Sequence, residues 1–432
     1  MKINKYSWEK MTRSEKEQVF SRSELNISAV SDTVNNIINE VRNEGDAALL
    51  KFNNQFDKTP LDMSLRVSDE EFDEAEKHIS DDVRDALIYS IENVRRFHNA
   101  QKPESMNMME VRPGVLVGEK ASPIESVGLY VPRGRGNFPS MLYMLALPAV
   151  VAEVPRICIV TPPDEKGKVD PACLVAARLC GITEIYKIGG AHAIAALAYG
   201  TETIKPVVKM NGPGSMYVTA AKRLVAGRVD IGMPAGPSES MVWADSNANP
   251  EKVALDLMIE AEHGSDSSAL LVTECSQLAD SVEKKIIQLT KDLGEPRKTF
   301  VTDVMKGYGG IILCESMEQS AKVINRFAPE HLQIQTTDPF ESLPYIKNAG
   351  EILLGDNTPF SIANYSVGAN AVLPTGGNAK TYSAISVRDF IKYSSVVYVS
   401  ADGLEEMKPH VISLADYEGF ETHGDALKKR RS

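Results

Sequence analysis

Apolar residues recur at helical spacing in the first hundred positions of the chain, which are otherwise polar. The segment SDTVNNIINEVRNEGDAALLKF has four of them on one side, as in an amphipathic helix: Val34, Ile37, Ile38 and Val41. Ser31 or Asp32 is the candidate N-cap of this helix. A second long helix is predicted from about residue 69 to residue 100. We therefore expect a helical N-terminal region over residues 1–125.

From about residue 126 the pattern changes to short β-branched runs that alternate with helical stretches. Predicted strands include VGLYVP, RICIVTPP and EIYKIGG, and the helices between them include SMLYMLALPAVVAEV and PACLVAARLCG. A second series of this kind runs from NPEKVALDLMIEAEH to EILLGD. Because such alternation is typical of parallel sheets with crossover helices, we predict an α/β fold. Its two modules cover residues 126–236 and 237–385, and a tail over residues 386–432 looks too short to fold alone.

The composition agrees with this globular picture and excludes some partners. The chain of 432 residues is long enough for two or three domains. Its net charge of −12 disfavours nucleic acid as a partner, because such binding depends on neutralising phosphates. No apolar segment reaches the roughly 18 residues that span a bilayer, and the first residues contain no apolar targeting segment. We therefore predict a cytoplasmic protein with no nucleic-acid and no membrane partner.

The five cysteines are odd in number, form no CxxC pair and lie mostly in apolar runs. This pattern favours reduced thiols in a reducing compartment. None of the five lies in a polar glycine loop, where a reactive thiol would be expected.

Two glycine-rich turns of the first module are candidates for anion binding: KIGGAHAIAA and KMNGPGSMYVTAAKRLV. Each places glycines between a strand and a helix, where backbone N–H groups can approach a dinucleotide pyrophosphate. Neither matches GxGxxG, so a purely structural turn is an equal alternative. Arg133 and Arg135 in VPRGRGNFPS either attract an anionic ligand or form surface ion pairs. The loop VDIGMPAGPSESMVWAD joins the two modules and is either part of a ligand cleft or a plain hinge.

Two short segments combine glutamate with histidine. In IEAEHG, Glu260 and His263 are three positions apart and face the same side of a helix, a pair that suits zinc. Two ligands alone do not make a metal site. Such a pair is more often a helix-end histidine beside an acidic residue, with no metal bound. In RFAPEHLQIQ, Glu330 and His331 follow Pro329, which ends the helix. A glutamate beside a histidine at such a junction suits a general base and its partner.

Taken in order, GLYVP, GGAHAIAALAYGT, GPGSMYVTAAK, AGPSES, EAEHGSDSSALLVT, FAPEHLQ, VLPTGG and EGFETH resemble the histidinol dehydrogenase family. The resemblance covers about residues 30–424. It implies two incomplete Rossmann-like modules and a C-terminal tail that crosses to the other subunit of a homodimer. It also implies oxidation of an amino alcohol through the aldehyde to the carboxylate, with NAD and one zinc ion per subunit.

The resemblance also assigns roles to single residues. His331 corresponds to the base that takes the alcohol proton, and Glu330 to the group that activates water for the aldehyde step. Four residues correspond to zinc ligands that also contact the substrate: Glu260, His263, Asn364 and His423. Ser238 and Glu418, with His331, correspond to substrate-binding positions. The cofactor-binding positions are Tyr130, His192 and Ser215.

The chain departs from the family pattern at several of these positions. The family has Gln where this chain has Glu260, and Asp where it has Asn364. The two changes cancel in charge, which favours a retained metal site if the two side chains lie close together. Ala371 replaces a histidine on the substrate side, and His192 and Ser215 replace Gln and Asn. Loss of one polar contact costs roughly 1–3 kcal/mol, so the oxidation is a firmer expectation than the substrate.

Three hypotheses therefore stand. The first is zinc- and NAD-dependent oxidation of L-histidinol or a related amino alcohol. The second is a paralogue with the same machinery and another polar alcohol, such as a sulfo- or sugar alcohol. The third is a nucleotide-binding protein without catalysis. The sequence leaves open whether one or two oxidations occur and whether a harder metal such as manganese replaces zinc.

Overall fold

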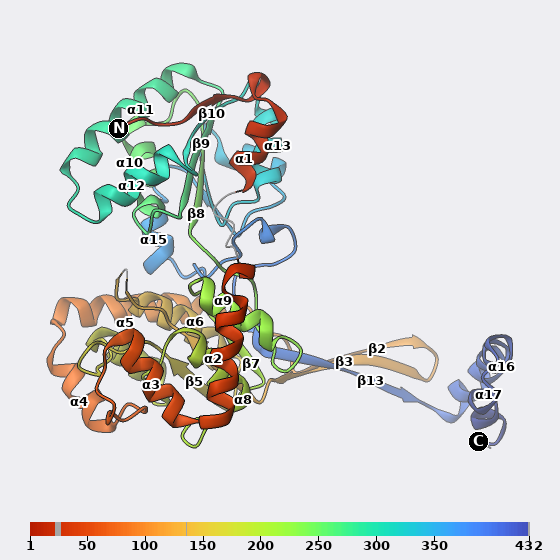
Figure 1. Ribbon diagram of the computed structural model, residues 1–432. Helices are drawn as coiled ribbons and strands as arrows, with labels where there is room; N and C mark the ends of the chain where they lie inside the picture. Colours follow the sequence, from red (N-terminus) through yellow and green to blue (C-terminus); the bar gives the residue numbers. More distant parts are fainter. Residues whose placement is uncertain (22–26, 135, 431–432) are drawn as a thin grey trace.

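The computed structural model describes residues 1–21, 27–134 and 136–430. Two parallel β-sheets, each flanked by helices, form two modules stacked on one another, and a narrow three-stranded arm projects sideways (Figure 1). The predicted α/β fold with parallel sheets is therefore confirmed. None of the helices among the described residues is long and apolar enough to cross a membrane.

The first module is built on a four-stranded sheet. Its strands are β4 (Ser126–Tyr130), β5 (Arg156–Val160), β6 (Ile185–Tyr186) and β7 (Lys209–Asn211), in the order β6-β5-β4-β7. Its helices are α6 (Pro139–Val151), α7 (Pro171–Cys180), α8 (Gly190–Tyr199) and α9 (Met216–Val225). Alternate side chains of β4 enter opposite cores: Val127 and Leu129 pack with α6 and α7, and Tyr130 packs with α8 and α9. A sheet buried on both faces explains why its strands are apolar throughout.

Helices from the N-terminal segment cover this sheet: α2 (Ser31–Glu44), α3 (Asp46–Asp57), α4 (Asp69–Lys77) and α5 (Asp81–Asn99). The apolar side predicted for residues 34–41 is buried as α2 packs on the module. The single helix predicted from about 69 to 100 is instead two helices, α4 and α5. The reason is Ser80, whose side chain accepts a hydrogen bond from the backbone N–H of Val83 and begins a new helix.

The second module contains a six-stranded sheet. Its strands are β1 (Lys5–Ser7), β8 (Glu239–Ala244), β9 (Ser268–Thr273), β10 (Gly310–Leu313), β11 (His331–Gln335) and β12 (Glu351–Leu354), in the order β1-β10-β9-β8-β11-β12. The helices on its two faces include α1 (Arg13–Ser21), α10 (Pro250–Ala261), α11 (Ser276–Leu289), α12 (Arg297–Lys306) and α13 (Met317–Phe327). A short helix, α15 (Phe360–Tyr365), follows β12.

The arm combines segments from before and after the two modules. Strands β2 (Met106–Arg112) and β3 (Val115–Pro123) form an antiparallel pair, and β13 (Ile391–Val399) pairs with the other edge of β3. Helices α16 (Ala401–Glu418) and α17 (Glu421–Lys428) lie at the tip of the arm, away from both modules (Figure 1). The segment 1–125 is thus divided among the first module, the sheet of the second module and the arm.

The cysteines agree with the expectation of core thiols. All five are free, four of them are buried, and Cys275 is partly buried.

Candidate functional site

Three neighbouring strands of the second module begin with a polar residue, so these residues lie at the same end of its sheet. Glu239, His331 and Glu351 are the first residues of β8, β11 and β12, and these three strands are parallel neighbours. The register pairs His331 with Ser240 on one side and with Glu351 on the other. The site therefore lies at the amino ends of these strands, whereas ligands of open α/β sheets usually bind at the carboxyl ends.

His331 is buried between carboxylates. Its Nδ1 atom lies 2.5 Å from Oε1 of Glu351, and its Nε2 atom lies 3.7 Å from Oε1 of Glu330. The ring of Phe360, the first residue of α15, packs edge-on against the imidazole. Burial disfavours the charged imidazolium, but the negative charges of the nearby glutamates outweigh burial and raise the pKa of His331. His331 is thus placed to accept and hold a proton.

Glu330 is held by the chain that enters the second module. Its Oε2 atom accepts a hydrogen bond of 2.9 Å from the backbone N–H of Glu239. Glu239 in turn accepts a bond of 2.9 Å from the backbone N–H of Gly376. Burial raises the pKa of Glu330 to about 8. A carboxyl group with such a pKa can take up and release protons near neutral pH, as acid–base catalysis requires.

Glu260, His263 and Asn364 meet at the end of α10. Oε2 of Glu260 lies 2.7 Å from Nδ1 of His263, and Oε1 of Glu260 accepts a bond of 2.7 Å from the side-chain amide of Asn364. Although burial opposes ionisation of Glu260, the neighbouring histidines and these hydrogen bonds lower its pKa to about 2. Glu260 and Asn364 are therefore in contact, as the argument for two substitutions that cancel in charge requires.

These residues form one cluster, because the charges of Glu260, His263, Glu330 and His331 influence one another. Among the described residues, no three side chains of the types His, Cys, Asp and Glu are arranged as metal ligands. The predicted set has an amide as its third member and His423 as its fourth. His423 is exposed on α17 at the tip of the arm, and Glu418 ends α16 nearby. Three predicted ligands are therefore together and the fourth is not.

The predicted cofactor residues belong to the first module. The chain passes from β4 to β5 and β6 on one side and then returns beside β4 as β7, so the strand order reverses between β4 and β7. Nucleotides bind outside the carboxyl ends of strands at such a reversal. Tyr130 is the last residue of β4, and Ser215 is the exposed N-cap of α9 just after β7. Both residues lie where this rule places a cofactor.

His192, the third predicted cofactor residue, is enclosed by protein. Its side chain packs against Phe52 and Phe56 and is only 1% exposed. The side-chain amide of Asn53 donates to the carbonyl of Lys187, so its oxygen faces Nε2 of His192 at 2.9 Å. Nε2 therefore carries the proton. The role of His192 in binding a cofactor stays a prediction.

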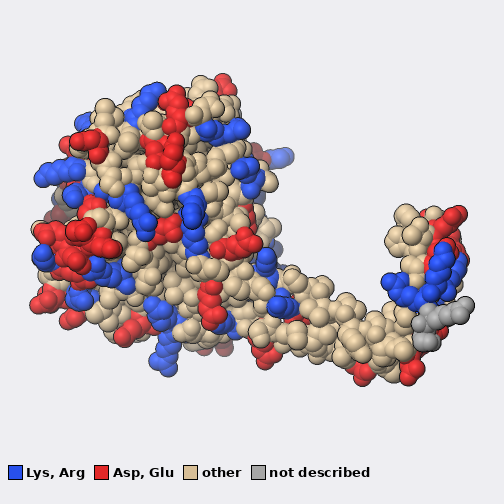
Figure 2. Space-filling view, turned by 90° about the horizontal axis from the view of Figure 1, so that it is seen from below, with Lys and Arg blue, Asp and Glu red and all other residues tan. Residues whose placement is uncertain are grey.

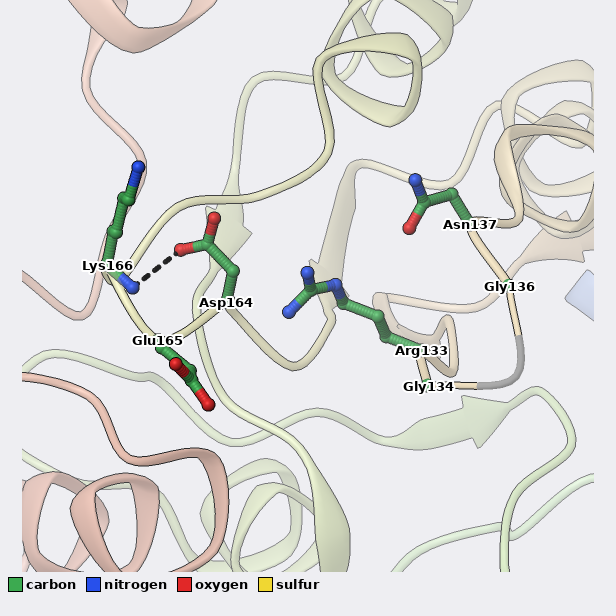
Figure 3. Close-up of a pocket in the computed structure, with 7 residues that line it drawn as sticks. All are labelled: Arg133, Gly134, Gly136, Asn137, Asp164, Glu165 and Lys166. Atoms are coloured by element: carbon green, nitrogen blue, oxygen red, sulfur yellow. Dashed lines mark hydrogen bonds between the residues drawn. The ribbon is translucent and has the colours of Figure 1, made fainter.

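An opening of about 620 Å³ lies beyond the carboxyl ends of β4 and β5. Figure 3 shows that Arg133 from one loop and Asp164 from the other face the same space. Asp164 also accepts a bond of 2.9 Å from the backbone N–H of Lys166. The opening is lined by Arg133, Gly134, Gly136, Asn137, Asp164, Glu165 and Lys166. Arg133 thus lies at a surface that an anion can reach, while Arg135 lies outside the described residues.

The two modules meet where the chain passes from β7 to β8. Gly212 and Gly214, which follow β7, share a small pocket with Pro234 and Ala235, which lead towards β8. Ser238 directly precedes β8 and is partly buried. The carboxyl end of β7 therefore lies close to the chain that leads into the amino end of β8.

The sequence analysis did not single out Glu351, and it included Glu239 only as part of the loop that is either a ligand cleft or a hinge. Their signal is present in the sequence, because each is an acidic residue at the start of an apolar strand, in ESMVWA and EILL. A charged residue at that position is costly to bury without a partner. The partners, however, come from strands far away in the sequence.

Comparison with known proteins identifies clear relatives. The sequence model of the family described as histidinol dehydrogenase matches residues 20–431. Histidinol dehydrogenase of Synechocystis sp. is 48% identical over 98% of this chain and 98% of its own length. A protein of Rhizobium meliloti named histidinol dehydrogenase homolog is 47% identical over 99% of this chain and 94% of its own length. The crystal structure of histidinol dehydrogenase from Elizabethkingia anophelis has a TM-score of 0.94 and 35% identity, covering 99% and 97% of the two chains.

Proposed function

Because the chain belongs to the histidinol dehydrogenase family and is a dehydrogenase, we propose that it oxidises a polar primary alcohol through the aldehyde to the carboxylate, with NAD and a divalent metal. L-histidinol or a related amino alcohol is the substrate. The observation that carries this proposal is the buried cluster of His331 and Glu330 beside Glu260 and His263.

His331 is the base of the first oxidation. The alcohol O–H proton moves to Nε2 of His331 while the carbinol carbon loses a hydride, so the alcohol becomes an aldehyde. Glu330 then takes a proton from water as the water oxygen adds to the aldehyde carbon. Its raised pKa, caused by burial, suits this proton uptake. The hydrated aldehyde would lose a second hydride, to a second NAD, and its remaining hydroxyl proton, which leaves the carboxylate.

The metal is held by Glu260, His263, Asn364 and His423, with His423 coming from the partner subunit. A buried carboxylate in contact with an imidazole and an amide is a donor set that divalent metals accept, and each oxygen of Glu260 already contacts one of the other two side chains. When bound, the metal orients and polarises the alcohol oxygen, and NAD accepts the hydride. Tyr130 and Ser215, at the reversal of the first sheet, bind NAD.

The arm supports assembly as a homodimer. It exposes large apolar side chains along its whole length: Met106, Met109, Val111, Tyr393, Val397, Tyr398, Leu414, Tyr417 and Phe420. In Figure 2 most of the surface of the arm carries no charged side chain, whereas the rest of the visible surface mixes both signs. Apolar side chains exposed side by side on an element of this kind are typical of protein interfaces. A dimer in which each arm crosses to its partner buries these side chains and brings Glu418 and His423 to the partner's cluster.

The His331→Asn variant tests the catalytic role. We expect a loss of turnover of roughly 100-fold or more, because a general base contributes about 10²–10⁴-fold. NAD reduction with L-histidinol measures this loss, and His78→Asn, at an exposed position on α4's C-cap, is the matched control. Metal analysis should give about one divalent ion per chain, and Glu260→Ala should lower this ratio. Wild-type turnover in His331→Asn would exclude the role of His331.

A paralogue that uses another polar alcohol is the second candidate. Proteins named histidinol dehydrogenase homolog are as similar to this chain as those named histidinol dehydrogenase, at 47% and 48% identity. Ala371, which packs against the core of the first module, also replaces the histidine expected on the substrate side. A panel of amino, sulfo and sugar alcohols assayed with NAD distinguishes the two. Strong turnover of histidinol alone would remove this candidate.

A further inference from the structure

Glu351 contacts His331 of the cluster and has no role in the proposed reaction. It is the first residue of β12, and the parallel register places its Cα opposite that of His331. The backbone N–H of Glu351 donates to the carbonyl of Glu330 over 3.0 Å, which fixes the two strand starts against each other. The side chains of His331 and Glu351 are 3% and 8% exposed.

The contact between the two side chains determines where the imidazole carries its proton. A carboxylate only accepts hydrogen bonds, so Nδ1 of His331 must donate to Oε1 of Glu351. Nε2 then keeps its lone pair in the neutral imidazole and points towards Glu330. Nε2 is the atom that takes the alcohol proton in the proposed reaction.

Packing alone does not account for Glu351. The other oxygen of this carboxylate, Oε2, is buried and makes no hydrogen bond with any described residue. The strand continues as Ile352, Leu353 and Leu354, so an apolar residue would suit the position at lower cost. The same negative charge stabilises the imidazolium that forms when His331 takes a proton. Glu351 thus costs folding free energy and benefits the protonated state of His331.

We propose that Glu351 is a positioning residue, which holds His331 with Nδ1–H directed at β12 and Nε2 directed at the substrate. This proposal rests on the proposed function for the role of His331 as base. The pair resembles in geometry the carboxylate and histidine of hydrolytic triads, in which the acid fixes the tautomer and the orientation of the imidazole.

Kinetics of two variants test the proposal. Glu351→Ala removes the acceptor, and we expect kcat to fall by roughly 10- to 100-fold with KM nearly unchanged, which is part of the contribution of a general base. Glu351→Gln keeps the shape but loses the charge, and its amide can donate to Nδ1 and hold the wrong tautomer, so it should not restore the lost turnover. Glu274 is the matched control, because it accepts a bond of 3.2 Å from the indole N–H of Trp243 elsewhere in the module. Glu274→Ala and Glu274→Gln should leave kcat unchanged.

A spectroscopic measurement tests the contact without substrate. In the holoenzyme labelled with ¹⁵N-histidine, the Nδ1–H proton of His331 should resonate far downfield, identified by its absence in His331→Asn. It should disappear in Glu351→Ala and also in Glu351→Gln, whose amide can donate to Nδ1. Absence of this resonance from the wild type overturns the proposal, even if Glu351→Ala fails to fold. Wild-type kcat in folded Glu351→Ala also overturns it.

The two proposals fail in different ways. Unchanged turnover in His331→Asn contradicts the proposed function and, with it, the positioning role. Unchanged turnover in Glu351→Ala, together with a large loss in His331→Asn, contradicts the positioning role alone.

Discussion

Glu260 and Glu330 are both buried, yet their pKa values move in opposite directions. Burial opposes the ionisation of both carboxyl groups. Glu260 receives hydrogen bonds from an imidazole and an amide, and nearby histidines favour its charge, so its pKa falls. Glu330 receives one backbone N–H and lies near other carboxylates, so its pKa rises. Two residues of one type are thereby suited to metal binding and to proton transfer.

The buried carboxyl group of Asp256 allows a prediction about the stability of the folded protein. Burial raises its pKa to about 6, even though Gln335 donates a bond of 2.7 Å to it. A carboxyl with a raised pKa binds its proton more tightly in the folded state, so it stabilises the fold below about pH 4 and loses that contribution as pH rises to about 6. We expect Asp256→Asn to stabilise the protein at pH 7 by about 3 kcal/mol.

The chemistry around Asp256 favours this result. The buried side-chain oxygens of Gln333 and Gln335 make no hydrogen bond with any described residue, and the amide that Asp256→Asn introduces could donate to them. Thermal unfolding of both proteins between pH 4 and pH 8 measures the effect. The difference in Tm should be largest above about pH 6 and vanish near pH 4. Asp62→Asn, at an exposed turn, is the control, and an equal gain at all pH values would refute the assignment.

At the scale of elements, the site depends on how closely β11 and β12 begin together. A Cβ atom on Gly350, which precedes β12, would lie 2.5 Å from the carbonyl oxygen of Glu330. Because that oxygen belongs to the backbone, the start of β12 would have to move away from β11. The side chains of His331 and Glu351 depend on this spacing.

Gly350→Ala should therefore lower kcat by roughly tenfold or more, since small displacements of catalytic groups are costly. Steady-state NAD reduction measures the change. Gly294→Ala is the matched control, because a Cβ there meets nothing within 4 Å. Equal activity of the two variants would show that the spacing of these strands does not matter for turnover.

At the scale of the whole molecule, three predicted metal ligands lie in the second module and the fourth lies at the tip of the arm. The proposed dimer joins them by exchange of arms. In a dimer formed from two different variant chains, the two active sites then carry different numbers of substitutions. If His331→Asn and His423→Ala chains associate, one site contains both defects and the other contains neither.

Mixing equal amounts of the two inactive chains under conditions of subunit exchange should restore about a quarter of the wild-type activity, because half of the dimers carry one intact site. Turnover before and after exchange measures the recovery. Each variant incubated alone is the control. No recovery, with mixed dimers present by native mass spectrometry, would contradict the exchange of arms.

The local pattern predicted most helices and strands, because burial of α2 or β4 follows from its own sequence. The local sequence of an element does not indicate which other element it packs against. The attachment of β1 to β10 and the meeting of His331 with Glu351 depend on segments far apart in the chain. Asn364 lies on a short helix that Phe360 anchors by packing in the core. The predicted ligands were brought to attention by the family resemblance, since Glu260 and His263 alone suggested only a helix end.

The pairing of β3 has a consequence for synthesis of the protein. Strand β3 ends at Pro123, but its second neighbour, β13, begins only at Ile391, after both modules. At roughly 5–20 residues per second, a ribosome leaves that edge of β3 open for on the order of half a minute. An open edge beside exposed apolar side chains can pair with another nascent chain. Polysomes, which carry several nascent copies close together, are therefore where we expect such mispairing to be most frequent.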